Sequence, residues 1–291
     1  QRLGVRRIVG LDAGQVASGA AGRNGGLLLA GPAHFHHRAV ATWGRRPAAE
    51  LYRLTLQAIQ DLARRHRHAV QVTGSARVAW ADGEADDLRA HHDAMRADAF
   101  PARLETVGGR LRLVIPDDAV FHPVERCEAL AEAAWEDDAW LYGDSPVIAL
   151  EGDRVVTPTG TVRADTILVC VDGGLERVVP ALAGRVRTVR LQVLATAPVA
   201  HGAVPIPEYH RFGLDYVQQR PDGRLVLGGA RDRDEGAEAP DVAATPTEPV
   251  QAALDAILAE RLDQSAATVT HRWAGLVGYT DDQLPVCEQV R

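Results

Sequence analysis

The spacing of apolar and charged residues predicts four helices, over residues 47–66, 84–99, 123–135 and 248–262. In the first of these, Leu51, Leu54 and Ile59 share one side of the helix. The second is strongly charged, and the third begins with a proline, whose missing N–H costs least at that position. Thr245 or Thr247 is available to cap the fourth.

Short apolar or alternating runs predict strands at 6–11, 69–80, around 140, and at 147–150, 154–157, 161–163, 166–171, 186–196, 209–219 and 224–229. Residues 1–4 resemble the end of a helix with a glycine stop, so we expect the chain to begin inside a β–α–β unit. The run 166–171 has the composition of a buried strand and ends in a glycine turn. The order of helix, meander, apolar strand and glycine turn predicts a Rossmann-like α/β fold.

Two segments do not fit a regular element. Residues 17–31 are rich in glycine, alanine and serine, with side chains too small to form a core, so we expect their backbone to approach another group closely. Residues 231–244 form an acidic stretch that we interpret as a solvated surface loop.

Composition excludes several classes of function. A net charge of −7 argues against nucleic acid, which needs a basic face. The three cysteines are far apart and suggest neither disulfides nor zinc, which favours the cytoplasm, and no apolar run is long enough for a membrane span. All 32 cationic residues are arginine, which removes a lysine Schiff base and the lysine of a P-loop. Because the chain begins at Gln1 and its one methionine is Met95, we expect it to be a fragment.

Asp12 follows an apolar strand, as does the acidic residue that binds ribose hydroxyls in dinucleotide folds. That residue lies about 20 positions after the glycine-rich phosphate loop, which places the loop roughly ten residues before Gln1. On this evidence alone an ordinary turn residue is the more common interpretation of Asp12, and an NAD-dependent dehydrogenase would also be allowed.

The segment GQVASGAAGRNGGLL, residues 14–28, is similar to the flavin-contacting segment of the D-amino-acid oxidase-like family, often written ASGRNGG. The resemblance implies FAD as the cofactor. It also implies that the pyrophosphate and the flavin ring are lined by Ser18, Arg23, Asn24 and the backbone of Gly25 and Gly26. Guanidinium and amide groups donate to phosphate and flavin oxygens, and glycines let the backbone approach a flat ring.

The resemblance continues along nearly the whole chain, at residues 73–79, 122–123, 212–231 and 272–285. It implies that the backbone of Val147 pairs with the adenine edge, and that Cys170, Asp172, Gly173 and Gly275 lie on the flavin side. Asp172 departs from the family's usual residue, and Gln283 replaces a frequent glycine. The chain also ends before the final glycine-rich flavin-contacting segment that the family has.

The family fold interleaves two domains in sequence. The resemblance implies a Rossmann-like FAD-binding domain from residues 1–38, 117–182 and 271–291. An antiparallel-sheet substrate domain is expected from residues 39–116 and 183–270.

The implied activity is oxidation of the C–N bond of a small amine or amino acid by hydride transfer to flavin, with electrons passing on to oxygen or to a carrier. We expect the fragment itself to be inactive. A remnant of the fold that binds no flavin and an NAD-dependent dehydrogenase remain the alternatives.

Flavin chemistry needs few catalytic side chains, so the candidates concern substrate binding. An arginine and a tyrosine hydroxyl are the natural clamp for a carboxylate, which points to Arg231 and Tyr216, although Arg231 could be a plain surface residue. His36 follows the flavin segment and could face the substrate.

Other residues near these candidates carry weaker signals. Adjacent histidines of a strand point to opposite faces, so the histidines at 34, 36, 37, 91 and 92 do not suggest a metal. We expect Trp273 to pack in the core rather than stack on substrate. A covalent flavin link through Cys287 is not favoured.

Overall fold

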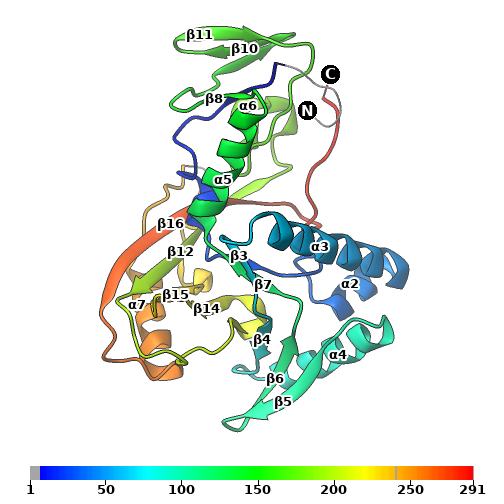
Figure 1. The fold of residues 1–291 in the computed structure, drawn as a ribbon, viewed down its shortest axis with the longest axis vertical. Coiled ribbons are helices and arrows are strands. Elements are labelled where there is room, and N and C mark those ends of the chain that lie inside the picture. The colour runs from blue at the N-terminus through cyan, green and yellow to red at the C-terminus, as the bar shows by residue number, and fades with distance from the viewer. Residues whose placement is uncertain (1–6, 240, 291) are drawn as a thin grey trace.

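A computed structural model of the chain describes residues 7–239 and 241–290. It shows a mixed α/β architecture and confirms the expected fold class (Figure 1). An upper part contains short strands with α5 and α6, and a lower part is built on a large sheet. The helix end expected over residues 1–4 and the start of the strand at Arg6 lie outside the described residues.

The helices are mostly those that the apolar spacing predicts. They are α1 (Ala20–Arg23), α2 (His36–Trp43), α3 (Arg45–Arg65), α4 (Glu84–Ala97), α5 (Pro123–Glu136), α6 (Leu175–Val178) and α7 (Glu248–Ala256). A π-helical turn over Ile257–Arg261 continues α7. Thr247 stands at the N-cap of α7, but its hydroxyl accepts a hydrogen bond from Gln192 (2.7 Å) rather than capping the helix. The helix α2 was not predicted, so the histidines at 36 and 37 lie in a helix and not in a strand.

The large sheet has eight strands. Their order is β16 (Val269–Tyr279), β12 (Arg187–Thr196), β15 (Leu225–Gly228), β14 (Asp215–Gln219), β13 (Glu208–His210), β4 (Ser75–Val78), β6 (Arg110–Ile115) and β5 (Arg103–Val107). Neighbouring strands are antiparallel except for β13 and β4. A smaller sheet joins β2 (Leu27–Leu28), β7 (Ala119–Phe121) and β3 (Val70–Val72).

The two faces of the large sheet are covered differently. On one face, Leu113 and Ile115 of β6 pack with residues of α3 and α4. On the opposite face, Leu194, Val217 and Leu227 pack under α7. Cross-strand pairing places Tyr216 on the first face, in one row with Gly228 and Val193. In Figure 1, α2, α3 and α4 accordingly lie to one side of the lower part and α7 to the other.

The upper part contains one parallel pair, β1 (Val9–Leu11) with β8 (Trp140–Tyr142). The meander that follows is β9 (Ala149–Glu151), β10 (Arg154–Thr157) and β11 (Gly160–Arg163). The strand expected at 166–171 is wrong, because this segment has no strand conformation. A strand forms only against a neighbour that takes its hydrogen bonds, and none of the described strands pairs with this apolar run. Leu168 is accordingly 83% exposed.

Two predicted strands are each divided by a turn. The run 69–80 breaks at Gly74 (φ +72°), so that β3 and β4 belong to different sheets. The run 209–219 breaks between β13 and β14, where Arg211 and Phe212 have positive φ values of 48° and 57°. The strands β5, β6 and β16 were not predicted, although arginine and leucine alternate in β6 as is typical of a strand.

None of the helices in the described residues is long and apolar enough to cross a membrane. Over the same residues, the side chains of histidine, cysteine, aspartate and glutamate form no group of three suited to a metal ion. Cys127, Cys170 and Cys287 are free thiols.

Candidate functional site

The glycine-rich segment turns back on itself through the one-turn helix α1, and backbone oxygens accept most of its side-chain bonds. Arg23 donates through Nε to the carbonyl of Ser18 (2.7 Å) and through Nη1 to that of Ala274 (3.1 Å). Asn24 donates to the carbonyls of Ala20 and Ala21, and its Oδ1 accepts the N–H of Gly26 (3.0 Å). The Asn24 side chain therefore fixes the shape of the loop in which the two glycines follow.

Gly25 and Gly26 are buried against the large sheet, where a side chain would not fit. A Cβ on Gly25 would lie 2.1 Å from Cε2 of Tyr216. Gly26 has a φ of +74°, and a Cβ there would lie 2.4 Å from the carbonyl oxygen of Phe121. Gln218 of β14 donates to the carbonyls of both glycines. The backbone of this segment therefore lies directly on β14, as the small side chains of residues 17–31 led us to expect.

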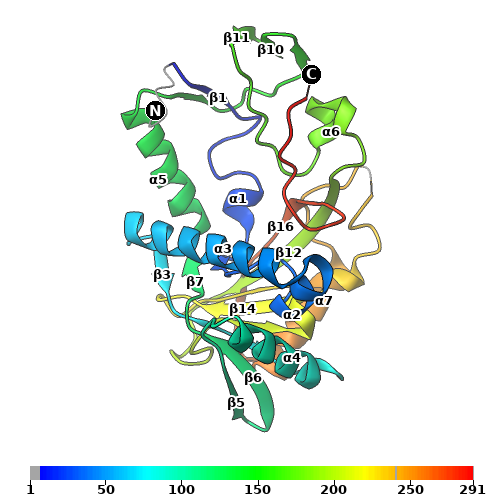
Figure 2. The ribbon, with the colours of Figure 1, turned by 90° about the vertical axis from the view of Figure 1, so that its right-hand side faces the viewer.

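The same segment contacts β16, which lies 250 residues further along the chain (Figure 2). Trp273 donates from Nε1 to the carbonyl of Arg23 (2.7 Å) while its ring packs on Val193 and Ala195. A Cβ on Gly275 would lie 3.4 Å from Cβ of Arg23. Trp273 therefore packs in the core and at the same time holds α1.

The glycine turn at 172–174 also reaches the large sheet. Asp172 accepts the N–H of Gly278 (2.8 Å), and Thr188 accepts that of Gly174 (2.8 Å). A Cβ on Gly173 would lie 2.8 Å from Cγ2 of Thr188. Segments around residues 23, 173 and 275, which are far apart in sequence, thus meet β12 and β16.

A cavity of about 660 Å³ opens on the face of the sheet that carries Tyr216. Arg231, Tyr279, Leu214 and Val189 are among its lining residues. The guanidinium of Arg231 lies 5.2 Å from the centre of the Tyr279 ring, and no carboxylate of the described residues pairs with it. Burial raises the pKa of Tyr216, and the nearby Tyr279 raises it further.

Tyr279 is a site residue that we did not predict. It stands at the end of β16, in the segment whose family resemblance pointed only to Gly275. The sequence around Tyr279 does not indicate that its ring lies near both Arg231 and Tyr216.

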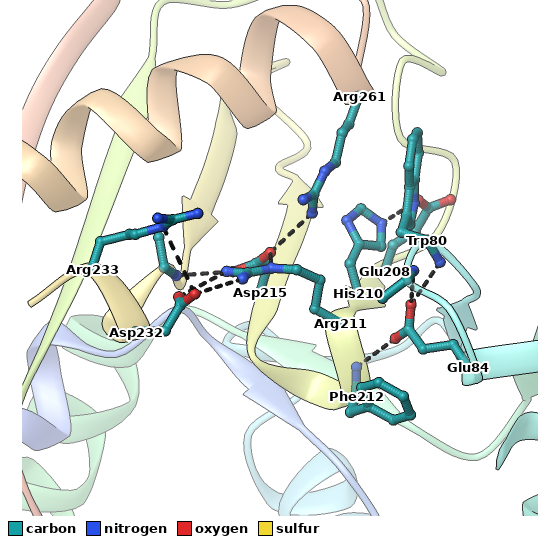
Figure 3. Close-up of polar contacts among 12 residues, drawn as sticks. Trp80, Glu84, Glu208, His210, Arg211, Phe212, Asp215, Asp232, Arg233 and Arg261 are labelled. Carbon is teal, nitrogen blue, oxygen red and sulfur yellow. Dashed lines mark hydrogen bonds and ion pairs between the residues drawn. The ribbon is translucent and has the colours of Figure 1, made fainter.

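An ionic cluster surrounds the buried carboxylate of Asp215, which lies on the face of the sheet opposite to Tyr216 (Figure 3). Arg211 donates to both carboxylate oxygens of Asp215 (2.6 and 2.8 Å), and Arg261 donates to Oδ2 (3.0 Å). Arg211 also pairs with Asp232 (2.9 Å). Burial alone would raise the pKa of Asp215, but the hydrogen bonds from Arg211 and Ala230 and the two arginine charges outweigh it and lower this pKa.

Most residues of the acidic stretch after Arg231 are exposed, as expected for a surface loop, but ion pairs attach part of it to neighbouring segments. Asp232 pairs with Arg211, and Asp234 forms a two-pronged ion pair with Arg190 (2.7 and 2.8 Å). Only 4% of the Asp234 side chain is exposed. These ion pairs fix the chain directly after Arg231.

The other residues expected to contact the cofactor lie in the upper part. Asp12 follows β1 and uses Oδ1 to accept the N–H of Gly14 (2.8 Å), with its side chain exposed. Val147 is partly buried two residues before β9, and Cys170 is exposed. Ser18 is exposed immediately before α1.

His36 contacts none of the residues described above for the cavity. It is buried between α2 and its neighbours, with Nε2 2.7 Å from Oδ2 of Asp98. The rings of Tyr52 and Phe100 meet it edge-on at 5.5 and 5.2 Å. None of these partners lines the cavity beside Arg231.

The arrangement at α1 fits a dinucleotide such as FAD. Within the described residues Arg23 has no carboxylate partner, and its Nη2 group has none of any kind, so a donor remains for a phosphate oxygen. The lack of side chains at Gly25 and Gly26, by contrast, serves the packing of this segment on Tyr216 and Phe121.

Comparison with known proteins agrees with this geometry. The sequence profile of the DAO family, described as "FAD dependent oxidoreductase", matches residues 1–291. A probable oxidoreductase, OrdL, from Rhizobium meliloti is 28% identical over 96% of this chain and 69% of its own length.

Solved structures show the same fold. Glycine oxidase from Geobacillus kaustophilus superposes with a TM-score of 0.76 at 19% identity, over 96% of this chain and 78% of its own. L-proline dehydrogenase from P. horikoshii gives 0.76 at 15% identity, over 98% and 84% of the two chains. L-amino acid deaminase from Proteus vulgaris gives 0.73 at 14% identity, over 98% and 75%.

Proposed function

The chain belongs to the DAO family of FAD-dependent oxidoreductases, and from this premise we propose that it oxidises the C–N bond of a small amino acid or amine. FAD, when bound, would supply the acceptor for the hydride of the carbon next to nitrogen, and the substrate would become an iminium ion as the nitrogen lone pair forms the C=N bond. Water then converts the resulting iminium ion into a carbonyl compound and ammonium. Oxygen or an electron carrier takes up the electrons.

We assign different parts of the FAD molecule to different residues of the chain. We assign to Asp12 the ribose hydroxyls as donors, and to Ser18 and Arg23 the pyrophosphate oxygens as acceptors. Asn24 shapes the loop that presents Gly25 and Gly26 to the ring. We assign the remaining contacts to Val147 on the adenine side and, on the flavin side, to Cys170, Asp172, Gly173 and Gly275.

The observation that carries the proposal is an arginine that pairs with no carboxylate of the described residues and lines a cavity on the Tyr216 face of the sheet. Arg231 lines the cavity, and Tyr216, on the same face of the sheet, packs directly on Gly25. A guanidinium binds a carboxylate through two parallel hydrogen bonds, and a tyrosine hydroxyl adds a third donor. Arg231 and Tyr216 would thus bind and orient the carboxylate, with Tyr279 holding the guanidinium plane.

An amino-acid substrate is also consistent with the names of structural relatives, which include an oxidase of glycine, a dehydrogenase of L-proline and a deaminase of L-amino acids. We assign no step to His36, because Asp98 occupies one of its ring nitrogens and aromatic rings enclose it.

Anaerobic titration of the purified flavoprotein with a panel of amino acids and their decarboxylated amines tests the function. Bleaching of the flavin absorption by an amino acid, with weaker response to the matching amine, is the expected result. A folded but colourless protein would instead indicate a remnant without flavin. A coloured protein that no member of the panel bleaches would exclude C–N oxidation of this substrate class.

A further inference from the structure

We propose that Asp215 is a positioning residue that sets the places of Tyr216 and Arg231 from the far side of the sheet. This inference rests on the proposed function, since it concerns the same substrate-binding residues. Asp215 begins β14 and is fully buried on the face that α7 covers, whereas the Tyr216 ring lies on the other face.

The carboxylate of Asp215 shapes the turn that leads to Arg231. Its Oδ1 accepts the N–H of Ala230 (2.9 Å), the residue directly before Arg231. Ala230 is buried in the left-handed conformation (φ +52°), which is unfavourable for a residue with a side chain and must be held by its surroundings. A Cβ on Gly229 would lie 2.4 Å from the same Oδ1, so the backbone of this turn lies directly on the carboxylate.

The same carboxylate also holds the turn before Tyr216. Arg211 (φ +48°) binds both oxygens of Asp215, and its neighbour Phe212 (φ +57°) is held by a hydrogen bond from its N–H to Glu84 (Figure 3). Two strained turns therefore depend on one buried group. Arg231 follows one turn, and Tyr216 follows Asp215 itself.

Asp215 is the buried centre of this cluster, and arginines compensate its charge. Arg211 and Arg261 pair with Asp215, while Arg211 and Arg233 pair with the partly exposed Asp232. Asp215→Asn keeps an oxygen for the N–H of Ala230 but leaves two arginines without their central partner. The variant should loosen the turn at 229–230 and let Arg231 leave its place over Tyr279.

Binding of benzoate to the holoenzyme, followed through the visible spectrum of the bound flavin, measures the consequence. Asp215→Asn should weaken benzoate by about tenfold or more, the scale of one lost charged hydrogen bond. It should also raise KM for an amino acid more than KM for the matching amine. Asp255→Asn is the matched control, because it removes an ion pair with Arg272 (2.8 Å) in the same part of the chain without touching either turn. The control should bind benzoate as the wild type does.

A double variant separates positioning from stability. In the Arg231→Lys background, Asp215→Asn should weaken benzoate less than it does in the wild type, because one of the two groups that it positions has already been replaced. Equal weakening in both backgrounds, or unchanged binding in Asp215→Asn, would overturn the inference. If Asp215→Asn does not yield folded holoenzyme, Arg211→Lys is used in its place, because lysine cannot bind both carboxylate oxygens of Asp215 at once. The same results with benzoate would support or overturn the inference. A wild type that binds no benzoate and oxidises no amino acid would refute the proposed function and with it this inference.

Discussion

Replacing Gly25 by alanine should push the Tyr216 ring out of its place. The added Cβ would lie 2.1 Å from Cε2 and 2.7 Å from Cζ of this ring, well inside contact distance. The ring cannot retreat freely, because on its other side a Cβ built on Gly228 would already lie 2.3 Å from Cζ. Tyr216 is therefore held between two glycines, and a single methyl group removes the space on one side.

The cost follows from overpacking. Extra methyl groups in a packed interior destabilise by about 1 to 3 kcal/mol. For a chain of this size that lowers the melting temperature by roughly 2 to 10 °C. Because the clash is with one ring, Tyr216→Ala should relieve it, so the double variant should be more stable than the sum of the single effects by about 1 to 3 kcal/mol.

Thermal denaturation of the two single variants and the double variant measures this coupling. Gly19→Ala is the matched control, since Gly19 lies in the same segment and a Cβ there would meet no atom within 4 Å. Its melting temperature should stay within about 1 °C of wild type, as for a surface substitution. Strictly additive effects of Gly25→Ala and Tyr216→Ala would show that the two residues do not touch, and the packing of the flavin segment on β14 would be refuted.

Three further predictions concern the cofactor, the substrate and pH. Arg23→Ala should weaken FAD by roughly ten- to a hundredfold in equilibrium dialysis, the scale of a charged hydrogen bond, and unchanged flavin content would contradict its assignment. Arg231→Lys should reduce kcat/KM for an amino acid much more than for the matching amine, and an equal loss for both would exclude a carboxylate contact. Because the pKa of Asp215 is lowered in the fold, its stabilisation is present above the ordinary carboxyl pKa of about 4 and is lost as pH falls through the lowered value. The melting temperatures of wild type and Asp215→Asn should therefore differ most near neutral pH and converge below pH about 4, and a constant difference would contradict the ion cluster.

Elements that form from local periodicity could be predicted from the sequence. The helix α5 was expected within one residue of its observed bounds, because its apolar spacing and initial proline are local signals. The strands β12 and β15 were expected for the same reason. The apolar run 166–171 has an equally clear pattern yet forms no strand, because a strand also requires a partner that periodicity does not reveal.

The cofactor segment was recognisable from its residues, but its surroundings were not. Bare backbone at Gly25 and Gly26 is visible in the sequence as a lack of side chains. That Tyr216 fills the space beside them depends on the pairing of β13, β14 and β15. The turn between β13 and β14 carries its strain on Arg211 and Phe212, residues that give no turn signal.

Asp215 shows why residues that support a site without lining it are difficult to predict from the sequence. It is the neighbour of Tyr216, and alternation along a strand sends neighbouring side chains to opposite faces. A carboxylate next to a substrate-binding tyrosine would therefore be dismissed as pointing away from the site. The Asp215 side chain can support the site because it points to the opposite face of the sheet. The turn before Arg231 passes over that face, and its N–H at Ala230 donates to the Asp215 carboxylate. Neighbouring residues of one strand thus act on opposite faces of the sheet. Tyr216 lies on the face where the cavity opens, and Asp215 holds the turn from which Arg231 reaches the cavity.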